Sequence, residues 1–97
     1  MPEYIMLFHF TTKGVQNIKE GPTRIKNAKK LFEQNGAKVK SFYAVLGQYD
    51  TVAIVEAPDD ETIAKISLQI SSQGNVSGET LRAFTEDQVV TMINQIP

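Results

Sequence analysis

Two short segments of this chain are apolar at nearly every position, and they constrain the fold more than any other feature. Tyr4 to Phe10 reads YIMLFHF, and Thr51 to Glu56 reads TVAIVE. Both are too short for long helices and are rich in β-branched or aromatic residues, so each predicts a strand that is covered on both faces. Such strands belong in the middle of a sheet, with more polar strands at its edges.

Two amphipathic helices are predicted between the strands. The first starts at Pro22, a favourable first helical residue, and ends at Gly36, which suits a left-handed cap. The second has Asp59 as its N-cap and ends at Gly74. Segment 11–20 stays open between a short helical turn and a loop. The apolar stripes that these helices would bury are Ile25, Ala28, Leu31 and Phe32 in the first, and Ile63, Ile66 and Ile70 in the second.

More polar segments predict the edge strands and a last helix. Lys38 to Val45 and Val76 to Ala83 are strand-like but carry charge, which guards a sheet edge against pairing with other chains. Between the second and third strands, Gly47 supplies a positive φ in a tight joint. Thr85 and Gln88 form a capping box that opens an amphipathic C-terminal helix. The order βαββαβ predicts a ferredoxin-like α+β fold with an antiparallel sheet, in which the first and third strands are central.

The sheet of this fold has a face that its own two helices cannot cover. Alternation along the first strand places Tyr4, Met6, Phe8 and Phe10 on one side and Ile5, Leu7 and His9 on the other. A monomer rarely leaves such an apolar face in water, and a second copy packing sheet on sheet covers it. We therefore expect a homodimer or a higher homo-oligomer. The alternative is that the C-terminal helix alone closes the face.

Composition excludes several classes of function. With no cysteine and one histidine among the 97 residues, disulfides and thiolate metal sites are impossible, and we expect no metal and no cofactor. The net charge of −1 gives nucleic acid binding little support. No apolar stretch approaches the ~18 residues of a membrane span, and no signal peptide is recognisable, so a cytoplasmic protein is expected.

A series of short motifs runs along the chain in a fixed order. The motifs are Met1-Pro2-x-Tyr4, Phe10-Thr11 followed by Gly14, Leu46-Gly47-x-Tyr49-Asp50, Val55-Glu56-Ala57-Pro58-Asp59-Asp60-Glu61-Thr62, Gly74-Asn75-Val76, and Glu79-Thr80-Leu81-Arg82-Ala83-Phe84-Thr85. In this combination the chain resembles the GYD domain family of small bacterial and archaeal proteins, as a single domain over residues 1–97. The resemblance implies a dimeric α+β barrel fold and no established activity.

Several residues could carry chemistry, and each also has a structural explanation. His9 could act as a general base, but a packed core or interface histidine is favoured because no metal-ligand partners surround it. Tyr49 and Asp50 could bind a polar ligand, although a structural role is favoured, in which Asp50 bonds the turn's own backbone and Tyr49 covers the core. Arg82 could hold an anion, or pair with an acidic side chain, either Glu56 or Asp50.

The sequence favours a small-ligand-binding or regulatory module. The ligand would occupy a cleft between sheet and helices, lined by residues such as Tyr43, Tyr49 and Arg82. One alternative is a cofactor-free enzyme of the oxygenase or isomerase type, with His9 as base; another is a purely structural oligomer subunit. Aromatic residues such as Phe8 and Phe42 predict packing rather than RNA stacking, because the first strand carries no basic residue besides the histidine.

Overall fold

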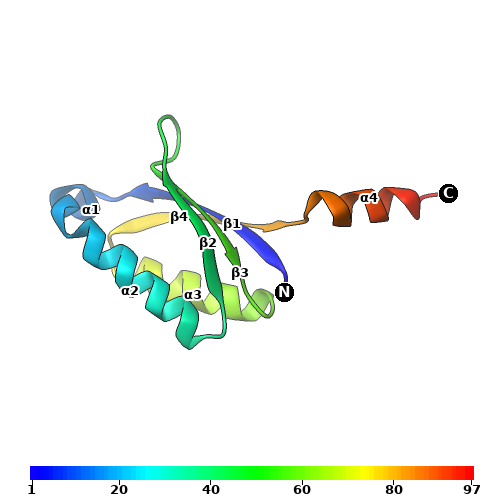
Figure 1. Ribbon diagram of the computed structural model, residues 1–97. Coiled ribbons are helices and arrows are strands. Elements are labelled where there is room, and N and C mark those ends of the chain that lie inside the picture. The colour runs from blue at the N-terminus through cyan, green and yellow to red at the C-terminus, as the bar shows by residue number, and fades with distance from the viewer.

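The computed structural model describes residues 1–97 and builds them around one four-stranded sheet (Figure 1). In chain order the elements are β1 (Glu3–Phe10), α1 (Thr12–Gln16), the 3₁₀ turn η1 (Ile18–Glu20), α2 (Gly21–Gln34), β2 (Lys38–Ala44), β3 (Thr51–Glu56), α3 (Asp60–Ser72), β4 (Val76–Ala83) and α4 (Glu86–Asn94). The strand order is β2-β3-β1-β4, and every neighbouring pair is antiparallel. This confirms the predicted ferredoxin-like α+β fold, with the first and third strands central.

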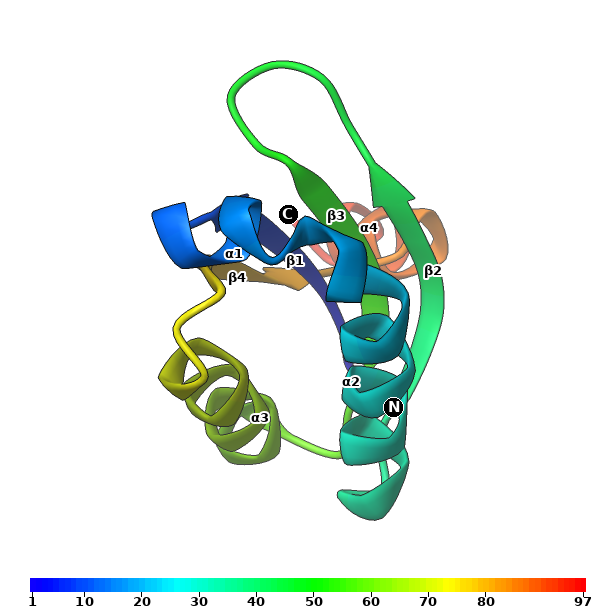
Figure 2. The same cartoon turned by 90° about the vertical axis from the view of Figure 1, so that its left-hand side faces the viewer.

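Helices α2 and α3 lie on the same face of the sheet, called the inner face below, and α2 runs beside β2 (Figure 2). The core forms where they meet this face. It consists of Tyr4, Met6 and Phe8 of β1, Ala53 and Val55 of β3, and Phe32, Ala37, Ala57, Ile63 and Ile66 from the helices and their connections. The predicted stripe of α3 therefore supplies Ile63 and Ile66 to the core, whereas Phe32 is the only core residue from the predicted stripe of α2.

The opposite, outer face of the sheet has no helix over it. The register places Ile5 opposite Ile54 and Leu7 opposite Val52, and all four side chains are only half-buried. Leu81 of β4, opposite Ile5, is 43% exposed. Within one protomer the two central strands are thus covered on one face only, not on both as their composition predicts.

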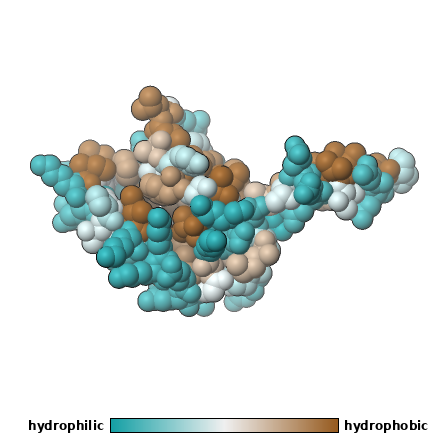
Figure 3. Space-filling view, in the orientation of Figure 1, coloured by the Kyte–Doolittle hydropathy of each residue, from teal (hydrophilic) through white to brown (hydrophobic).

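Helix α4 projects away from the sheet and covers none of it (Figure 1). The radius of gyration is 14.8 Å, whereas a compact chain of this length has about 12.5 Å. The apolar residues of α4 are 39–58% exposed, namely Val89, Val90, Met92 and Ile93. Brown, hydrophobic atoms run along this helix in Figure 3. The alternative that the C-terminal helix alone closes the outer face is therefore wrong for a single protomer.

The predicted helix ends are largely confirmed. The Asp59 side chain accepts a hydrogen bond from the Thr62 N–H at 2.8 Å, and hydrogen bonding to Thr62 lowers the pKa of that carboxyl. Gly36, with a φ of 69°, closes α2 while the Ala37 N–H donates to the Phe32 carbonyl. The Thr85 capping box is present at the start of α4. Helix α2 begins at Gly21, one residue before the predicted Pro22.

Three local features differ from the sequence pattern or resolve it. Segment 11–20 forms a short helix and a 3₁₀ turn rather than a loop. Residues 45–50 form a protruding loop instead of a tight joint, and Leu46 within it is fully exposed, although Gly47 does have the predicted positive φ of 111°. A bulge between Val39 and Ser41 shifts the register of β2.

Candidate functional site

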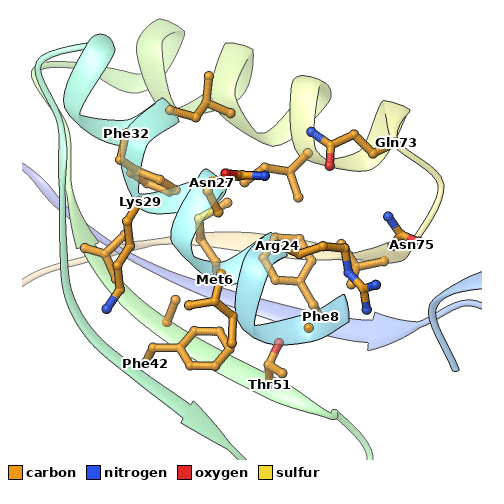
Figure 4. A pocket seen from close by; sticks show the side chains of 18 of the residues that line it. Met6, Phe8, Arg24, Asn27, Lys29, Phe32, Phe42, Thr51, Gln73 and Asn75 are labelled. Carbon is orange, nitrogen blue, oxygen red and sulfur yellow. The ribbon is translucent and has the colours of Figure 1, made fainter. Parts of the chain in front are cut away.

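A cavity of about 500 Å³ lies between the inner face of the sheet and helices α2 and α3 (Figure 4). Its lining is mainly apolar, and two groups of side chains form it. The sheet contributes Met6, Phe8, Phe10, Val39, Phe42, Ala44, Thr51, Ala53 and Val76, and the helices contribute Ile18, Ile25, Ala28, Leu31, Phe32 and Ile70. A volume of this size falls within the range of roughly 300–1,000 Å³ that is typical of small-molecule sites.

Small residues and diverging helices leave this space open. Gly21 and Ala28 of α2, Ala44 of β2 and Ala53 of β3 all line the cavity, where larger side chains would fill it. The two helices are splayed apart over the sheet (Figure 2). The sequence therefore builds a core around Tyr4 and Met6 but leaves the space next to it unfilled.

The floor of the cavity carries one polar side chain. Thr51 is the only buried polar residue of the chain, at 6% exposure, and its hydroxyl points toward the cavity (Figure 4). The hydroxyl of Thr80 is the only fully buried side-chain nitrogen or oxygen without a hydrogen-bond partner, and Thr80 does not line the cavity. The Thr51 hydroxyl bonds no other residue and lines the cavity, so it is available to a molecule that enters there.

The rim of the cavity is polar. It includes Arg24, Asn27 and Lys29 of α2, with Gln69, Ser72, Gln73 and Asn75 from the end of α3 onward. The Arg24 guanidinium donates to the Asn17 carbonyl at 2.7 Å and to the Gly14 carbonyl at 3.5 Å, and it lies 3.9 Å from Glu20. These contacts fix the guanidinium in place and leave some of its five N–H donors free.

His9 and Tyr49, two of the predicted site residues, lie together on the outer face. Their rings stack with centroids 4.6 Å apart, and the Tyr49 hydroxyl donates to Glu79 at 2.5 Å. That hydrogen bond raises the pKa of Tyr49. Tyr43 shares this face, because it pairs with Val52 across β2 and β3. The three aromatic residues are therefore on the side of the sheet opposite the cavity.

Asp50 has the structural role that the sequence favours, though with a different partner. Its carboxylate accepts a hydrogen bond from the backbone N–H of Phe10 on β1, rather than one from its own turn. Tyr49 does not cover the core, since it stacks on His9 instead. The pair thus anchors the 45–50 loop to the end of the central strand.

Arg82 lies at the far end of β4 and pairs with neither predicted acidic residue. Its guanidinium donates to the carbonyls of Glu3 and Ala83, and it lies 4.5 Å from the ring centre of Phe84 and 5.6 Å from that of Tyr4. Glu56 is instead 3.5 Å from Lys40, whose pKa is raised mainly by its hydrogen bond to Glu3.

The structure therefore splits the predicted site. The expected cleft between sheet and helices exists, but Tyr43, Tyr49 and Arg82 do not line it. Sequence reasoning missed Thr51 and Arg24, although one signal was present: Thr51 is a polar residue in a mainly apolar central strand. No group of three His, Cys, Asp or Glu residues could hold a metal ion, and no helix is long and apolar enough to cross a bilayer.

The chain is similar to several known proteins. The sequence model of the GYD domain matches residues 4–93. A Thermus thermophilus protein named glutamine synthetase and cystathionine beta-lyase binding protein is 40% identical over 85 residues, which are 87% of this chain and 90% of that protein. The crystal structure of TTHA0845, also from Thermus thermophilus, is similar with a TM-score of 0.56 and 26% identity, covering 88% of this chain and 95% of the other.

A more distant similarity concerns the fold. The feast or famine regulatory protein of M. tuberculosis, solved in complex with L-methionine, has a TM-score of 0.62 and 16% identity, covering 91% of this chain. At this identity the likeness shows a shared fold. This chain spans only 55% of the length of that regulatory protein.

Proposed function

This chain belongs to the GYD domain family, and from that premise we propose that it is a homo-oligomeric binding module that holds a small ligand in the cavity between the sheet and helices α2 and α3. The observation that carries the proposal is the cavity itself, with its apolar lining and its single buried polar side chain, Thr51. A closed interior, filled by side chains, would have favoured a purely structural subunit. The open space adjoining a well-packed core favours a ligand.

A regulatory role is consistent with the fold. The feast or famine regulatory protein, which shares this fold, was solved in complex with L-methionine. A small domain can report the level of a metabolite when binding changes its association with another molecule. We propose the same arrangement here, with ligand binding on the inner face and association through the outer face and α4.

Self-association follows from the apolar surface that one protomer leaves uncovered. The outer face presents half-buried aliphatic side chains, and α4 adds an exposed apolar helix. A two-fold dimer needs one such surface only, because the same patch serves both copies. Light scattering coupled to size exclusion tests this: a dimer or larger species is expected, and a monomer at micromolar concentration would contradict it.

A second candidate function is the binding of a metabolic enzyme. The relative that is 40% identical is named for binding glutamine synthetase and cystathionine beta-lyase, and an exposed amphipathic helix such as α4 is a common recognition element. Titrating the purified protein against these two enzymes by interferometry tests this. Submicromolar binding would support the candidate, and the absence of binding to both would remove it.

An enzyme with His9 as general base finds less support. His9 stacks on Tyr49 on the outer face, so a substrate in the cavity would lie on the other side of the sheet. Turnover that depends on His9 would need a second site between protomers.

A thermal-shift screen of cell metabolites tests the main proposal directly. The matched control is Ala28→Phe, which places a large side chain into the cavity from α2. A compound that raises the melting temperature of the wild type, but not that of Ala28→Phe, supports the proposal. No hit from a panel that includes anionic, aromatic and aliphatic compounds would count against it.

A further inference from the structure

Resting on the proposed function, we infer that the ligand is an apolar carboxylic acid without an ammonium group, whose oxygen atoms meet Arg24 at the rim and Thr51 on the floor of the cavity. The class of ligand follows from the shape, the charge and the hydrogen-bonding capacity of the lining. Each of these three properties excludes a different group of metabolites.

The shape excludes small polar metabolites. The cavity volume of about 500 Å³ is the volume of roughly 17 water molecules at about 30 Å³ each. Aromatic and aliphatic side chains make up most of the wall, among them Phe8, Phe42 and Ile25. A small polar compound would leave much of this surface facing water, whereas an extended apolar body would cover it.

The charge of the lining excludes amines and zwitterions. The charged lining residues are Arg24 and Lys29, and no aspartate or glutamate contributes to the cavity. A ligand ammonium would lose its hydration without gaining a counter-charge, which is costly inside a protein. A carboxylate beside a guanidinium gains a charge-assisted hydrogen bond instead. The ligand therefore differs from free amino acids, which carry an ammonium group.

The hydrogen-bonding capacity of the floor calls for an oxygen in the ligand. Thr51 is only 6% exposed and points toward the cavity (Figure 4). Its hydroxyl can both donate and accept, so it suits a carboxylate, hydroxyl or carbonyl oxygen. A purely hydrocarbon ligand would leave the Thr51 hydroxyl unpaired, at a cost in affinity.

Calorimetric titration of the full chain with decanoate, decylamine and L-methionine tests the inference. Decanoate is expected to bind, and decylamine, which has the same chain and the opposite charge, is expected not to bind. Arg24→Gln should weaken decanoate binding about tenfold or more, since it removes a charged hydrogen-bond donor. Decylamine binding as tightly as decanoate would overturn the inference.

Two threonine variants provide a matched pair. Thr51→Val preserves the shape and removes the hydroxyl. It should therefore weaken the binding of 10-hydroxydecanoate, whose hydroxyl can meet Thr51 while its carboxylate meets Arg24, about threefold to tenfold. Thr80→Val makes the same change on β4, outside the cavity, and should leave binding unchanged. Circular dichroism confirms that both variants remain folded. Equal affinities in the wild type and Thr51→Val would remove Thr51 from the site.

The same experiments separate the ligand class from the proposed function. If L-methionine or a compound without a carboxylate binds and Ala28→Phe abolishes that binding, the cavity remains the site and the ligand class is wrong. If decanoate binds equally well to Ala28→Phe, it binds elsewhere, which overturns the inference. If no metabolite of the wider screen depends on Ala28, the proposed function itself fails.

Discussion

The carboxylate of Asp50 accepts a hydrogen bond from the backbone N–H of Phe10 at 2.8 Å, while the Asp50 N–H donates to the carbonyl of Phe8 at 2.9 Å. These two bonds extend the pairing of β1 and β3 beyond Phe8 and Thr51, their last register pair. The Asp50 carbonyl also accepts from the Val45 N–H, which closes the loop. The acidic residue of the Gly-x-Tyr-Asp element is therefore a structural link between loop and sheet.

Replacing this carboxylate should destabilise the protein. Asp50→Ala leaves the Phe10 N–H without its charged acceptor, at an expected cost of about 1.5–3 kcal/mol in the free energy of unfolding. Asp50→Asn keeps a neutral acceptor and should cost less. Urea denaturation followed by circular dichroism measures both. If the two variants matched the wild type, the link would have no energetic role.

Two further family motifs meet at the same end of the sheet. The Thr11 hydroxyl donates to the Gly74 carbonyl at 2.6 Å, and the Thr11 N–H donates to the Asn75 carbonyl at 3.0 Å. The backbone of Gly14 packs so closely here that a Cβ on it would lie 2.0 Å from the Asn75 oxygen. Motifs that lie far apart in sequence thus form one backbone junction.

Gly14→Ala should therefore be strongly destabilising. The clash is with backbone atoms, which cannot rotate away, so the expected loss is about 1–3 kcal/mol or more. Gly21→Ala is the matched control, because a Cβ there meets nothing within 4 Å and the residue is already helical. The control should stabilise the chain by about 0.4–1 kcal/mol. Equal melting temperatures for the two variants would contradict this explanation.

The alkaline limit of stability should depend on Tyr4. Burial and a hydrogen bond of 2.5 Å to Asp60 raise its pKa from 10.0 to about 12. Because the folded state holds this proton more tightly, the contribution is complete below pH 10 and is lost as the pH rises toward 12. The loss amounts to at most about 2–3 kcal/mol, because screening by solvent reduces it. Chemical denaturation across this range should show a decline that is shallower in Tyr4→Phe, whereas parallel declines would refute the assignment.

How far the sequence predicts this structure depends on how local the cause is. The helix caps at Asp59 and Thr85 were predictable because their partners lie three residues away. The central position of β1 and β3 was predictable because strands that are apolar at nearly every position are typical of the middle of a sheet, with another strand paired on each edge. The bulge at Lys40 was not predictable. The Lys40 side chain forms ion pairs with Glu3 and Glu56, which are far from it in the sequence.

The candidate site shows the same limit. Strand alternation places Tyr43 and Phe42 on opposite faces of the sheet. It does not reveal which of these two faces the helices cover. The cavity depends on small residues from three elements, Ala28, Ala44 and Ala53, and on the divergence of α2 and α3. No pattern within one segment encodes such a space, so Thr51 and Arg24 became visible as site residues only in the folded chain.

The projecting helix α4 should carry part of the self-association. Ile93 is 58% exposed on a helix that packs on no part of its own sheet (Figure 1), so burial of this residue requires a second molecule. A charge there would be desolvated on association, which should weaken the dimer of Ile93→Glu at least tenfold. Asn94→Glu adds the same charge at the neighbouring, polar position and should leave the dimer intact.

Sedimentation equilibrium of both variants over a range of concentrations measures this difference, and circular dichroism verifies that each remains folded. Because α4 lies apart from the core, neither change should alter the unfolding of the sheet. A dimer of Ile93→Glu as tight as that of the wild type would mean that the outer face associates without α4. The exposed apolar stripe of α4 would then be free to bind a different protein, as the second candidate function requires.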